Sequence, residues 1–291
     1  MLVLTGAGGF IGSVLLKYLN KKGYHDIVLF DSLPQEDQYK NLIGSTFRSL
    51  HAFDDYSCIT SHLQSVQCVI HVGANSNTLE KNWSKIYQQN VLSTRIWHDL
   101  CQSHSVPFIF ISSAAVYGNG NGPLNAYAFS KHASEHEING VILRLFNVYG
   151  PNEYHKGRMA STMMHWFQSL TTDKNLCLYA DSDQYHRDFI WVEDVCKTVL
   201  HFISHHRPGI YDVGTGQNVD FASIADGVLQ CYGSGSIKTI PMPDDLLPQY
   251  QINTKANVIA LKAAGVKVDD FVPADRGIEM YWDYLRNNEF Y

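Results

Sequence analysis

A glycine-rich turn near the amino terminus constrains the fold of this chain more than any other feature. Gly6, Gly9 and Gly12 follow an apolar run at residues 2–5, and from Phe10 onward apolar residues recur at helical spacing. A strand, a GxxGxxG turn and a helix in this order are typical of a dinucleotide-binding βαβ unit. The amino terminus of such a helix offers N–H donors and a partial positive charge to a pyrophosphate. The sequence therefore predicts that this turn, with Phe10 and Ile11, binds a nicotinamide dinucleotide.

Asp31 bears on which dinucleotide the turn accepts. It ends the second predicted strand, residues 27–30, where a carboxylate can accept hydrogen bonds from the adenosine ribose hydroxyls, with Ser32 beside it. A carboxylate repels the 2′-phosphate of NADP, which favours NAD. Lys40 and Arg48 are the nearby cations that could reverse this preference, and both are equally compatible with solvated surface positions. The sequence therefore leaves the choice between NAD and NADP open.

Short apolar runs alternate with helical patterns through the first half of the chain. Further buried strands are expected at residues 68–72, 108–111 and 141–145, with a helix around 83–101 between the first two. This alternation is the pattern of a parallel sheet with crossover helices. The predicted fold class is therefore α/β, a Rossmann-type doubly wound parallel sheet.

The second half of the chain has more turns and shorter elements. We expect a helix over residues 160–170, another near the carboxyl terminus, and a strand at 188–192 that returns to the sheet and leads into a helix. The expected dinucleotide-binding domain comprises residues 1–147 and about 188–215. A smaller, segment-exchanged α/β lobe, residues 148–187 and about 216–291, would bind substrate over the carboxyl ends of the strands.

Composition argues against several other classes of protein. Of the 291 residues, 17% are charged and the net charge is −6, so no basic surface for nucleic acid is expected. No apolar run approaches the roughly 20 residues of a membrane helix, and no signal peptide precedes the first strand, which indicates a cytoplasmic protein. The six cysteines show no disulfide or metal-ligand spacing, and none of the 14 histidines lies in a zinc motif, so no metal is expected.

Tyr127 and Lys131 form a YxxxK pair on a predicted helix. The spacing places the phenol and the ammonium on one helical face, where the ammonium should bring the pKa of the tyrosine towards neutrality. Lys131 can also hold the nicotinamide ribose. Ser113, at the end of a predicted strand, can hydrogen-bond the reacting oxygen. An incidental surface pair is the alternative, but the order of glycine turn, strand-end serine and YxxxK is more specific than any one part.

With these three motifs the chain resembles the extended short-chain dehydrogenase/reductase superfamily of sugar-nucleotide enzymes. The resemblance implies that Ser113, Tyr127 and Lys131 are a catalytic triad. It also implies a tightly bound nicotinamide that takes a hydride from a sugar carbon and later returns it. The 4,6-dehydratases of the superfamily carry an Asp-Glu pair after the serine, whereas this chain has Ala114 and Ala115, which argues against dehydration.

A second resemblance is narrower. The stretch HKGRMAS at residues 155–161 is similar to the ADP-glyceromanno-heptose 6-epimerase family, and further matches occur at 187–189, 214–216, 250–251 and 261–265. That family inverts C6 of the heptose used in the bacterial lipopolysaccharide core. The resemblance makes Lys156 a second acid/base group, which would serve hydride delivery to the opposite face of C6. A phosphate-binding or merely exposed lysine is the alternative for Lys156.

Further contacts are implied by position. Asn75, Asn90 and Val148 would lie near the cofactor, although Asn90 is also compatible with a helix face without function. Arg187 would hold the diphosphate, because its planar fork matches phosphate oxygens; a surface ion pair with Asp183 or Asp188 is the alternative. The substrate contacts implied in this way are Ser113, Asn147, Arg158, His165, Tyr179, Ser182, Arg187 and Tyr250.

The chain departs from the heptose epimerase pattern in four respects. It has Arg158 in place of serine, Asn75 in place of cysteine, Ala180 in place of an acidic residue, and a shorter loop between residues 118 and 127. A sugar-nucleotide epimerase is therefore predicted more firmly than the ADP-heptose. A reductase that consumes NADPH and a dinucleotide-binding sensor without turnover are the alternatives, and the presence of all four catalytic residues argues against the sensor. The resemblance also implies a homo-oligomer.

Overall fold

The computed structural model describes residues 1–34, 37–60, 62–244 and 246–287. A seven-stranded parallel sheet with the order β11-β6-β5-β4-β1-β2-β3 confirms the predicted Rossmann-type α/β fold. β1 pairs with both β2 and β4, so the strand order reverses beside β1, where open α/β sheets bind their ligands. The strands are Leu2–Thr5 (β1), Ile27–Phe30 (β2), Ser49–His51 (β3), Cys68–His71 (β4), Phe108–Ser113 (β5), Val141–Leu145 (β6) and Gly209–Val213 (β11).

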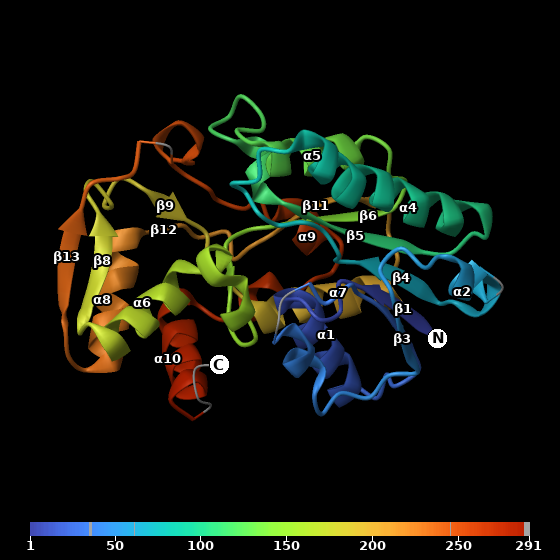
Figure 1. Ribbon diagram of the computed structural model, residues 1–291, viewed down its shortest axis with the longest axis horizontal. Helices are drawn as coiled ribbons and strands as arrows, with labels where there is room; N and C mark the ends of the chain where they lie inside the picture. Colours follow the sequence, from blue (N-terminus) through green and yellow to red (C-terminus); the bar gives the residue numbers. More distant parts are fainter. Residues whose placement is uncertain (35–36, 61, 245, 288–291) are drawn as a thin grey trace.

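Helices cover both faces of this sheet, with α1 and α7 on one side and α4 and α5 on the other (Figure 1). Leu4 faces the core of α1 and α7, whereas its neighbour Val3 packs in the opposite core with Trp97 of α4. Because both faces of the sheet are buried, its strands read as continuous apolar runs. These helices are α1 (Phe10–Lys21), α2 (Ser57–Thr60), α4 (Ser93–Ser103), α5 (Ala126–Glu135), α7 (Val192–Ser204) and α9 (Ile259–Ala263).

A second group of elements lies at the other end of the molecule (Figure 1). It has its own apolar core, in which Phe167, Leu176, Ile224 and Tyr281 are buried together. The group contains α6 (Thr162–Thr172), β8 (Asn175–Tyr179), β9 (His186–Arg187), β12 (Val219–Asp220), α8 (Phe221–Tyr232), β13 (Ser236–Ile240) and α10 (Ala274–Asn287). β13 pairs with β8 in parallel, and β12 pairs with β9 antiparallel.

The strand predicted at residues 188–192 does not return to the large sheet, so that prediction is wrong. The structure has a short strand, β10 (Ile190–Trp191), which pairs with β7 (Val148–Tyr149) in a separate two-stranded ladder. The place beside β6 in the large sheet is taken by β11, which follows α7. The helix predicted after the strand is present as α7, with Glu193 and Asp194 in its first turn.

The helix predicted around residues 83–101 is interrupted by a π-helical turn. It consists of α3 (Trp83–Ile86), the π-helical η3 (Tyr87–Leu92) and then α4. The remaining short helices are η1 (Gln38–Leu42), η2 (Leu63–Ser65), η4 (Ala114–Tyr117), η5 (Tyr154–Met159), η6 (Leu247–Gln249) and η7 (Val268–Asp270). None of the helices in the described ranges combines the length and apolarity needed to span a bilayer.

Candidate active site

The glycine turn lies between β1 and α1, as the sequence predicted. Gly6 has a φ of +67°, and a Cβ at this position would lie 2.6 Å from the backbone of Gly73. A Cβ on Gly12 would lie 2.1 Å from the carbonyl oxygen of Gly6. Gly9 caps α1 without a side-chain hydrogen bond, and the first turn of α1 contains no acidic residue. The turn and the helix amino terminus therefore suit the close approach of an anion such as a pyrophosphate.

Asp31 lies directly after β2 and is tied to the glycine turn. Its Oδ2 accepts a hydrogen bond from the backbone N–H of Gly8 at 2.8 Å, and its Oδ1 accepts one from that of Leu33 at 2.7 Å. Burial raises the pKa of the carboxyl group, and the backbone hydrogen bonds oppose this rise. Asp31 thus places a buried carboxylate beside the turn, while the neighbouring Ser32 is exposed.

The two cations that could reverse a preference for NAD both pair with other carboxylates. Lys40 Nζ lies 3.1 Å from Asp37 Oδ1, and Arg48 Nε lies 2.7 Å from Asp26 Oδ1. Lys40 and Arg48 therefore form ion pairs with carboxylates other than that of Asp31.

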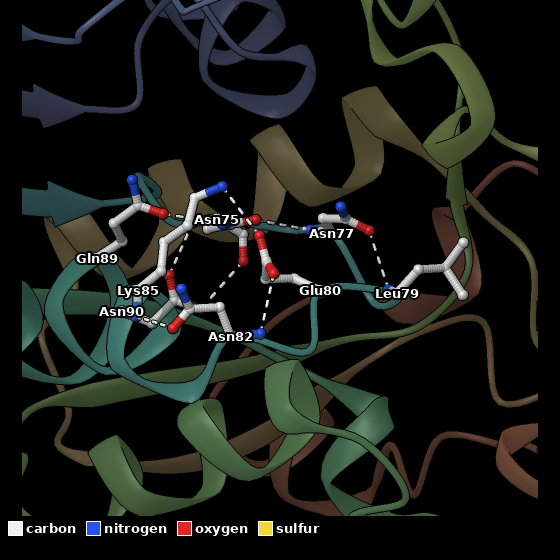
Figure 2. A network of polar contacts seen from close by, with 8 residues as sticks. All are labelled: Asn75, Asn77, Leu79, Glu80, Asn82, Lys85, Gln89 and Asn90. Carbon is white, nitrogen blue, oxygen red and sulfur yellow. Dashed lines mark hydrogen bonds and ion pairs between the residues drawn. The ribbon is translucent and has the colours of Figure 1, made fainter.

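Asn75 and Asn90 are joined in a polar network that shapes the loop after β4 (Figure 2). Asn90 is 1% exposed, and its Oδ1 accepts from the N–H of Asn75 at 2.7 Å. Its Nδ2 donates to the carbonyl oxygen of Asn75 at 3.0 Å and to Ser130 Oγ at 2.9 Å. Asn90 thus clamps the loop to α5. A cofactor contact by Asn75 or Asn90 stays a prediction, because these bonds occupy the Asn90 amide within the protein.

The rest of this loop is held by short-range hydrogen bonds, also visible in Figure 2. Glu80 accepts from the N–H of Asn82 at 3.0 Å and pairs with Lys85 Nζ at 2.9 Å. Beyond the network, Thr78 Oγ1 lies 3.7 Å from the sulfur of Met159. The loop after β4 therefore keeps a defined shape and reaches the segment that contains Lys156.

Ser113, Tyr127 and Lys131 meet where β5 packs against α5. Asn125 caps α5 by accepting from the N–H of Ala128 at 2.9 Å, which places Tyr127 in the first turn of the helix. The Ser113 side chain interacts with the Tyr127 hydroxyl closely enough to lower its pKa. The structure thus joins the predicted strand-end serine to the predicted YxxxK helix.

The directions of the pKa shifts of Tyr127 and Lys131 differ from the prediction. Lys131 is buried, and its Nζ donates to the carbonyl oxygen of Ile111 at 2.7 Å and lies 4.6 Å from the ring centroid of Phe110. Burial lowers the pKa of Lys131 to about 7. Burial also raises the pKa of Tyr127, against the hydrogen bond with Ser113. The prediction that Lys131 brings the tyrosine pKa towards neutrality is therefore wrong in this structure, because the amine bonds a carbonyl and both groups are desolvated.

Lys156 lies in η5, which the buried carboxylate of Glu153 holds in place. Glu153 Oε1 accepts from Ser161 Oγ at 2.6 Å and from the hydroxyl of Tyr281 at 2.7 Å. The Nζ of Lys156 lies 5.6 Å from the ring centroid of Phe10, at the start of α1. Burial lowers the pKa of Lys156, and the charge of Glu153 opposes this. Lys156 is therefore a half-buried amine beside the nucleotide turn.

The segment before Lys156 contacts the glycine turn through residues that sequence reasoning missed. Asn41 of η1 is 1% exposed, and its Nδ2 donates to the carbonyl oxygen of Gly8 at 2.9 Å. The same nitrogen lies 3.2 Å from Nδ1 of His155. Asn152 Nδ2 donates to Ser13 Oγ of α1 at 3.0 Å. Single asparagines in irregular segments have no periodic spacing, so this contact could not be predicted from the sequence.

Arg187 is a buried cation between two aromatic rings. It is 5% exposed, and its guanidinium carbon lies 5.3 Å from the ring centroid of Phe221 and 4.9 Å from that of Tyr250. Its Nη1 donates to the carbonyl oxygens of His186 at 2.9 Å and Ile252 at 3.3 Å. Within the described part of the chain no carboxylate forms an ion pair with it, and burial lowers its pKa. Such a group has a high affinity for an anion that replaces its lost hydration.

Asp188 does not neutralise Arg187, so the alternative of a surface ion pair is wrong. Asp188 Oδ1 accepts from the N–H of Thr215 at 2.8 Å, and its Oδ2 accepts from that of Gly216 at 2.8 Å and from that of Ala256 at 3.1 Å. The carboxylate therefore stabilises the turn after β11, and its hydrogen bonds go to that turn and to Ala256. Asp183 is exposed, whereas Arg187 is buried.

Tyr250, whose ring lies beside Arg187, belongs to a segment that contacts the loop after Ser113. Gln251 Nε2 donates to the carbonyl oxygen of Gly118 at 2.9 Å, and the Asn119 amide bonds the backbone of Tyr250 at 3.2 Å and that of Ile252 at 2.8 Å. Because Arg187 also bonds the carbonyl oxygen of Ile252, this segment links the predicted anion-binding residue to the loop after the predicted catalytic serine.

The other predicted substrate contacts divide into two groups. Tyr179 and Ser182 are linked to Tyr250, the ring beside Arg187. The Tyr179 ring lies 6.4 Å from that of Tyr250, and Ser182 Oγ donates to the Tyr179 carbonyl oxygen. Asn147, Arg158 and His165 are exposed, and Val148 is half-buried in β7. Substrate or cofactor contacts by these four residues stay predictions.

Among the residues that the structure describes, one group of possible metal ligands lies outside this site. Ligand atoms of His51, Asp55 and Cys58 lie within 4.8 Å of one another. The thiol of Cys58 already donates to the Asp55 carbonyl oxygen at 3.1 Å, and His51 Nε2 lies 2.8 Å from Ser49 Oγ. We assign this group no role in the site.

Residues 2–214 match the NAD dependent epimerase/dehydratase family. The chain is 34% identical over 317 residues, covering 100% of this chain and 99% of the relative, to ADP-L-glycero-D-manno-heptose-6-epimerase of Brachyspira hyodysenteriae. Among solved structures, the enzyme of that name from Helicobacter pylori is 24% identical with a TM-score of 0.84, covering 99% of this chain and 96% of that one. UDP-glucuronic acid 4-epimerase from Bacillus cereus is 23% identical with a TM-score of 0.83, covering 98% and 99%. The glycine turn, Ser113, Tyr127, Lys131 and Lys156 all lie within the matched residues, and the chain belongs to the NAD dependent epimerase/dehydratase family.

Proposed function

We propose that this protein is an epimerase that inverts C6 of ADP-glycero-manno-heptose, a step in the synthesis of the lipopolysaccharide core. The observation that carries the proposal is the buried Arg187 guanidinium, which has no carboxylate partner in the described chain. It donates to the carbonyl oxygen of Ile252, whose N–H is bonded to Asn119 in the loop after Ser113. A nucleotide diphosphate supplies the anion that such a cation requires. The heptose is supported by the HKGRMAS stretch and by the name of the 34% identical relative.

The bound nicotinamide supplies reversible hydride transfer, so the reaction needs no net reductant. Ser113 and Tyr127 are hydrogen-bonded to each other and can hold one hydroxyl between them, with a proton moving at the Tyr127 oxygen. Inversion presents the opposite face of C6, so a second acid/base group is required. Lys156 is the proposed second group, since burial lowers the pKa of its amine.

The proposed cofactor is NAD in preference to NADP. Asp31 holds a carboxylate beside the glycine turn, where it would accept from the ribose hydroxyls of NAD and repel the 2′-phosphate of NADP. Lys40 and Arg48 pair with Asp37 and Asp26, so their charges are partly neutralised there.

The proposal also includes the organisation of the chain. Residues 1–147 and about 188–215 would form the dinucleotide-binding domain, and residues 148–187 and about 216–291 the substrate lobe. The protein would act in the cytoplasm as a homo-oligomer, as its resemblance to the heptose epimerases implies.

The decisive experiment is to incubate purified protein with ADP-D-glycero-D-manno-heptose, without added reductant, and to follow the C6 configuration by NMR. Appearance of the L-glycero epimer would support the proposal, and Tyr127→Phe should abolish it. Tyr39→Phe, at an exposed tyrosine, is the matched control and should retain activity. An unchanged heptose, from protein shown to bind NAD, would refute the heptose assignment. A panel of other nucleotide sugars would then separate a different epimerase from a reductase, which consumes NADPH.

A further inference from the structure

A buried set of polar side chains joins the strand of the catalytic serine to the helix of Tyr127 and Lys131. Its centre is Glu135, the last residue of α5, which is 7% exposed. Ser112, the neighbour of Ser113 in β5, donates from its Oγ to Glu135 Oε1 at 2.5 Å. Arg144 of β6 donates to both carboxylate oxygens, from Nε to Oε1 at 2.9 Å and from Nη2 to Oε2 at 2.5 Å.

Arg144 extends the set to the turn that follows Ser113. Its Nη1 donates to the hydroxyl of Tyr117 at 2.7 Å, and its guanidinium carbon lies 4.7 Å from the Tyr117 ring centroid. The Tyr117 hydroxyl donates to Asp212 Oδ1 of β11 at 2.7 Å. The hydrogen-bonded set therefore connects β5, α5, β6, η4 and β11 on both sides of Ser113.

This arrangement is not explained by stability alone. The side chains of Glu135 and Arg144 are only 4% and 16% exposed. Removing two charges from water costs about as much as their attraction returns, so a buried ion pair is a weak source of stability. Its bonds instead go to Ser112 and Tyr117, which flank the segment of the catalytic serine. The geometry indicates a role in the placement of the site.

Glu135 also acts on Lys131 through its charge. It lies four residues after Lys131 on α5, so the two side chains share one helical face. The charge of Glu135 raises the pKa of Lys131 against the effect of burial, and the same carboxylate is paired with Arg144. The charge of Lys131 also acts on His71 of β4, but burial lowers the pKa of His71 to about 3 and leaves it neutral. The Lys131 amine itself donates to the carbonyl oxygen of Ile111.

We propose that Glu135 is a positioning residue of the active site. Through Ser112 and Arg144 it fixes the segment of Ser113 against the helix of Tyr127 and Lys131, and it places a negative charge on the face of α5 that carries Lys131. This inference rests on the proposed function, in which these three residues are catalytic.

The test uses two substitutions with opposite expected effects on Lys131. Glu135→Gln removes the anion and leaves Arg144 unbalanced, so the titration midpoint of Lys131 should fall by about one pH unit. Arg144→Gln leaves the Glu135 charge unshared, so the midpoint should rise. The midpoint is measured by NMR of lysine labelled with ¹³C at Cε, and the signal is assigned by its loss in Lys131→Arg. A network that only stabilises the fold would shift neither midpoint, or both in the same direction, and either result would overturn the proposal.

Two controls separate charge from structure. Ser112→Ala removes a hydrogen bond but no charge, so it should leave the Lys131 midpoint in place while lowering turnover. Glu137→Gln, at an exposed carboxylate paired with Arg95, should change neither. If Glu135→Gln does not fold, the double variant Glu135→Gln with Arg144→Gln is used, because it removes both charges of the ion pair together. The titration midpoint of Lys131 should still fall in this double variant. A wild-type midpoint in a folded variant would refute the charge role. Because this readout needs no substrate, it remains decisive if the heptose assignment fails.

Discussion

The Nζ of Lys156 lies 5.6 Å from the ring centroid of Phe10, so the predicted second acid/base group rests on the first residue of the helix that begins at the glycine turn. The contact joins a segment after β7 to the amino-terminal βαβ unit. It is reinforced nearby by Asn41, whose Nδ2 donates to the carbonyl oxygen of Gly8. The proposed catalytic amine and the proposed cofactor turn are thus parts of one packed region.

Lys156→Met should lower kcat for epimerisation by about 10²–10⁴-fold, the usual contribution of an acid/base group. Binding of NADH, measured by fluorescence, should change little, because methionine retains the contact with Phe10. Lys81→Met, at an exposed lysine, serves as the control. A variant with wild-type kcat would show that Lys156 is not an acid/base group.

Arg187→Met should weaken the binding of ADP by about 10–100-fold, because a charge-assisted bond to phosphate is lost. The unfolding temperature of the ligand-free protein should not fall, since the substitution removes a buried cation without a carboxylate partner in the described chain. Isothermal titration calorimetry and thermal denaturation measure the two effects. Arg276→Met, at an exposed arginine, should leave ADP binding unchanged. Undiminished ADP affinity in Arg187→Met would exclude a diphosphate contact.

Asp31→Asn should reduce the preference for NAD over NADP. The substitution removes the charge that repels the 2′-phosphate, so NADP affinity should rise relative to NAD affinity by about 10-fold. Binding of NADH and NADPH is measured side by side by fluorescence. Asp26→Asn, which removes the partner of Arg48, tests whether freeing that cation has the same effect. We expect no change in the ratio from Asp26→Asn.

The pKa of about 7 for Lys131 predicts a specific dependence of stability on pH. Because the folded-state pKa lies below the unfolded value, the unfolded chain binds more protons between about pH 7 and pH 10. The folded state should therefore gain stability as pH rises in that window, by up to about 1.4 kcal/mol per pH unit relative to Lys131→Met. Chemical denaturation at pH 7, 8 and 9 measures this difference. Lys262→Met, at an exposed lysine, should show no such divergence. Parallel curves for the wild type and Lys131→Met would contradict the lowered pKa.

Much of the fold was predictable because its signals are local. Residues buried on both faces of a parallel sheet give apolar runs, and helices give their own spacing, so five of the seven strands of the large sheet were anticipated. β3 was missed because it is only three residues long, Ser49–His51, and none of the three is fully buried. The return strand was misplaced because residues 188–192 and 209–213 are both apolar enough to form strands, and only the pairing partner distinguishes them.

From the sequence by itself came the glycine turn, the YxxxK helix and the strand-end serine, and the family resemblance singled out Arg187 as a phosphate-binding cation. The first three features depend on spacing along the chain or on a residue's own conformational limits, such as a glycine at positive φ. The tertiary structure alone decided that Arg187 lies between Phe221 and Tyr250, that Glu135 joins Ser112 to Arg144, and that burial raises the pKa of Tyr127. The partners of a side chain and the extent of its burial depend on which distant segments pack around it. Neither can be read from its neighbours along the sequence.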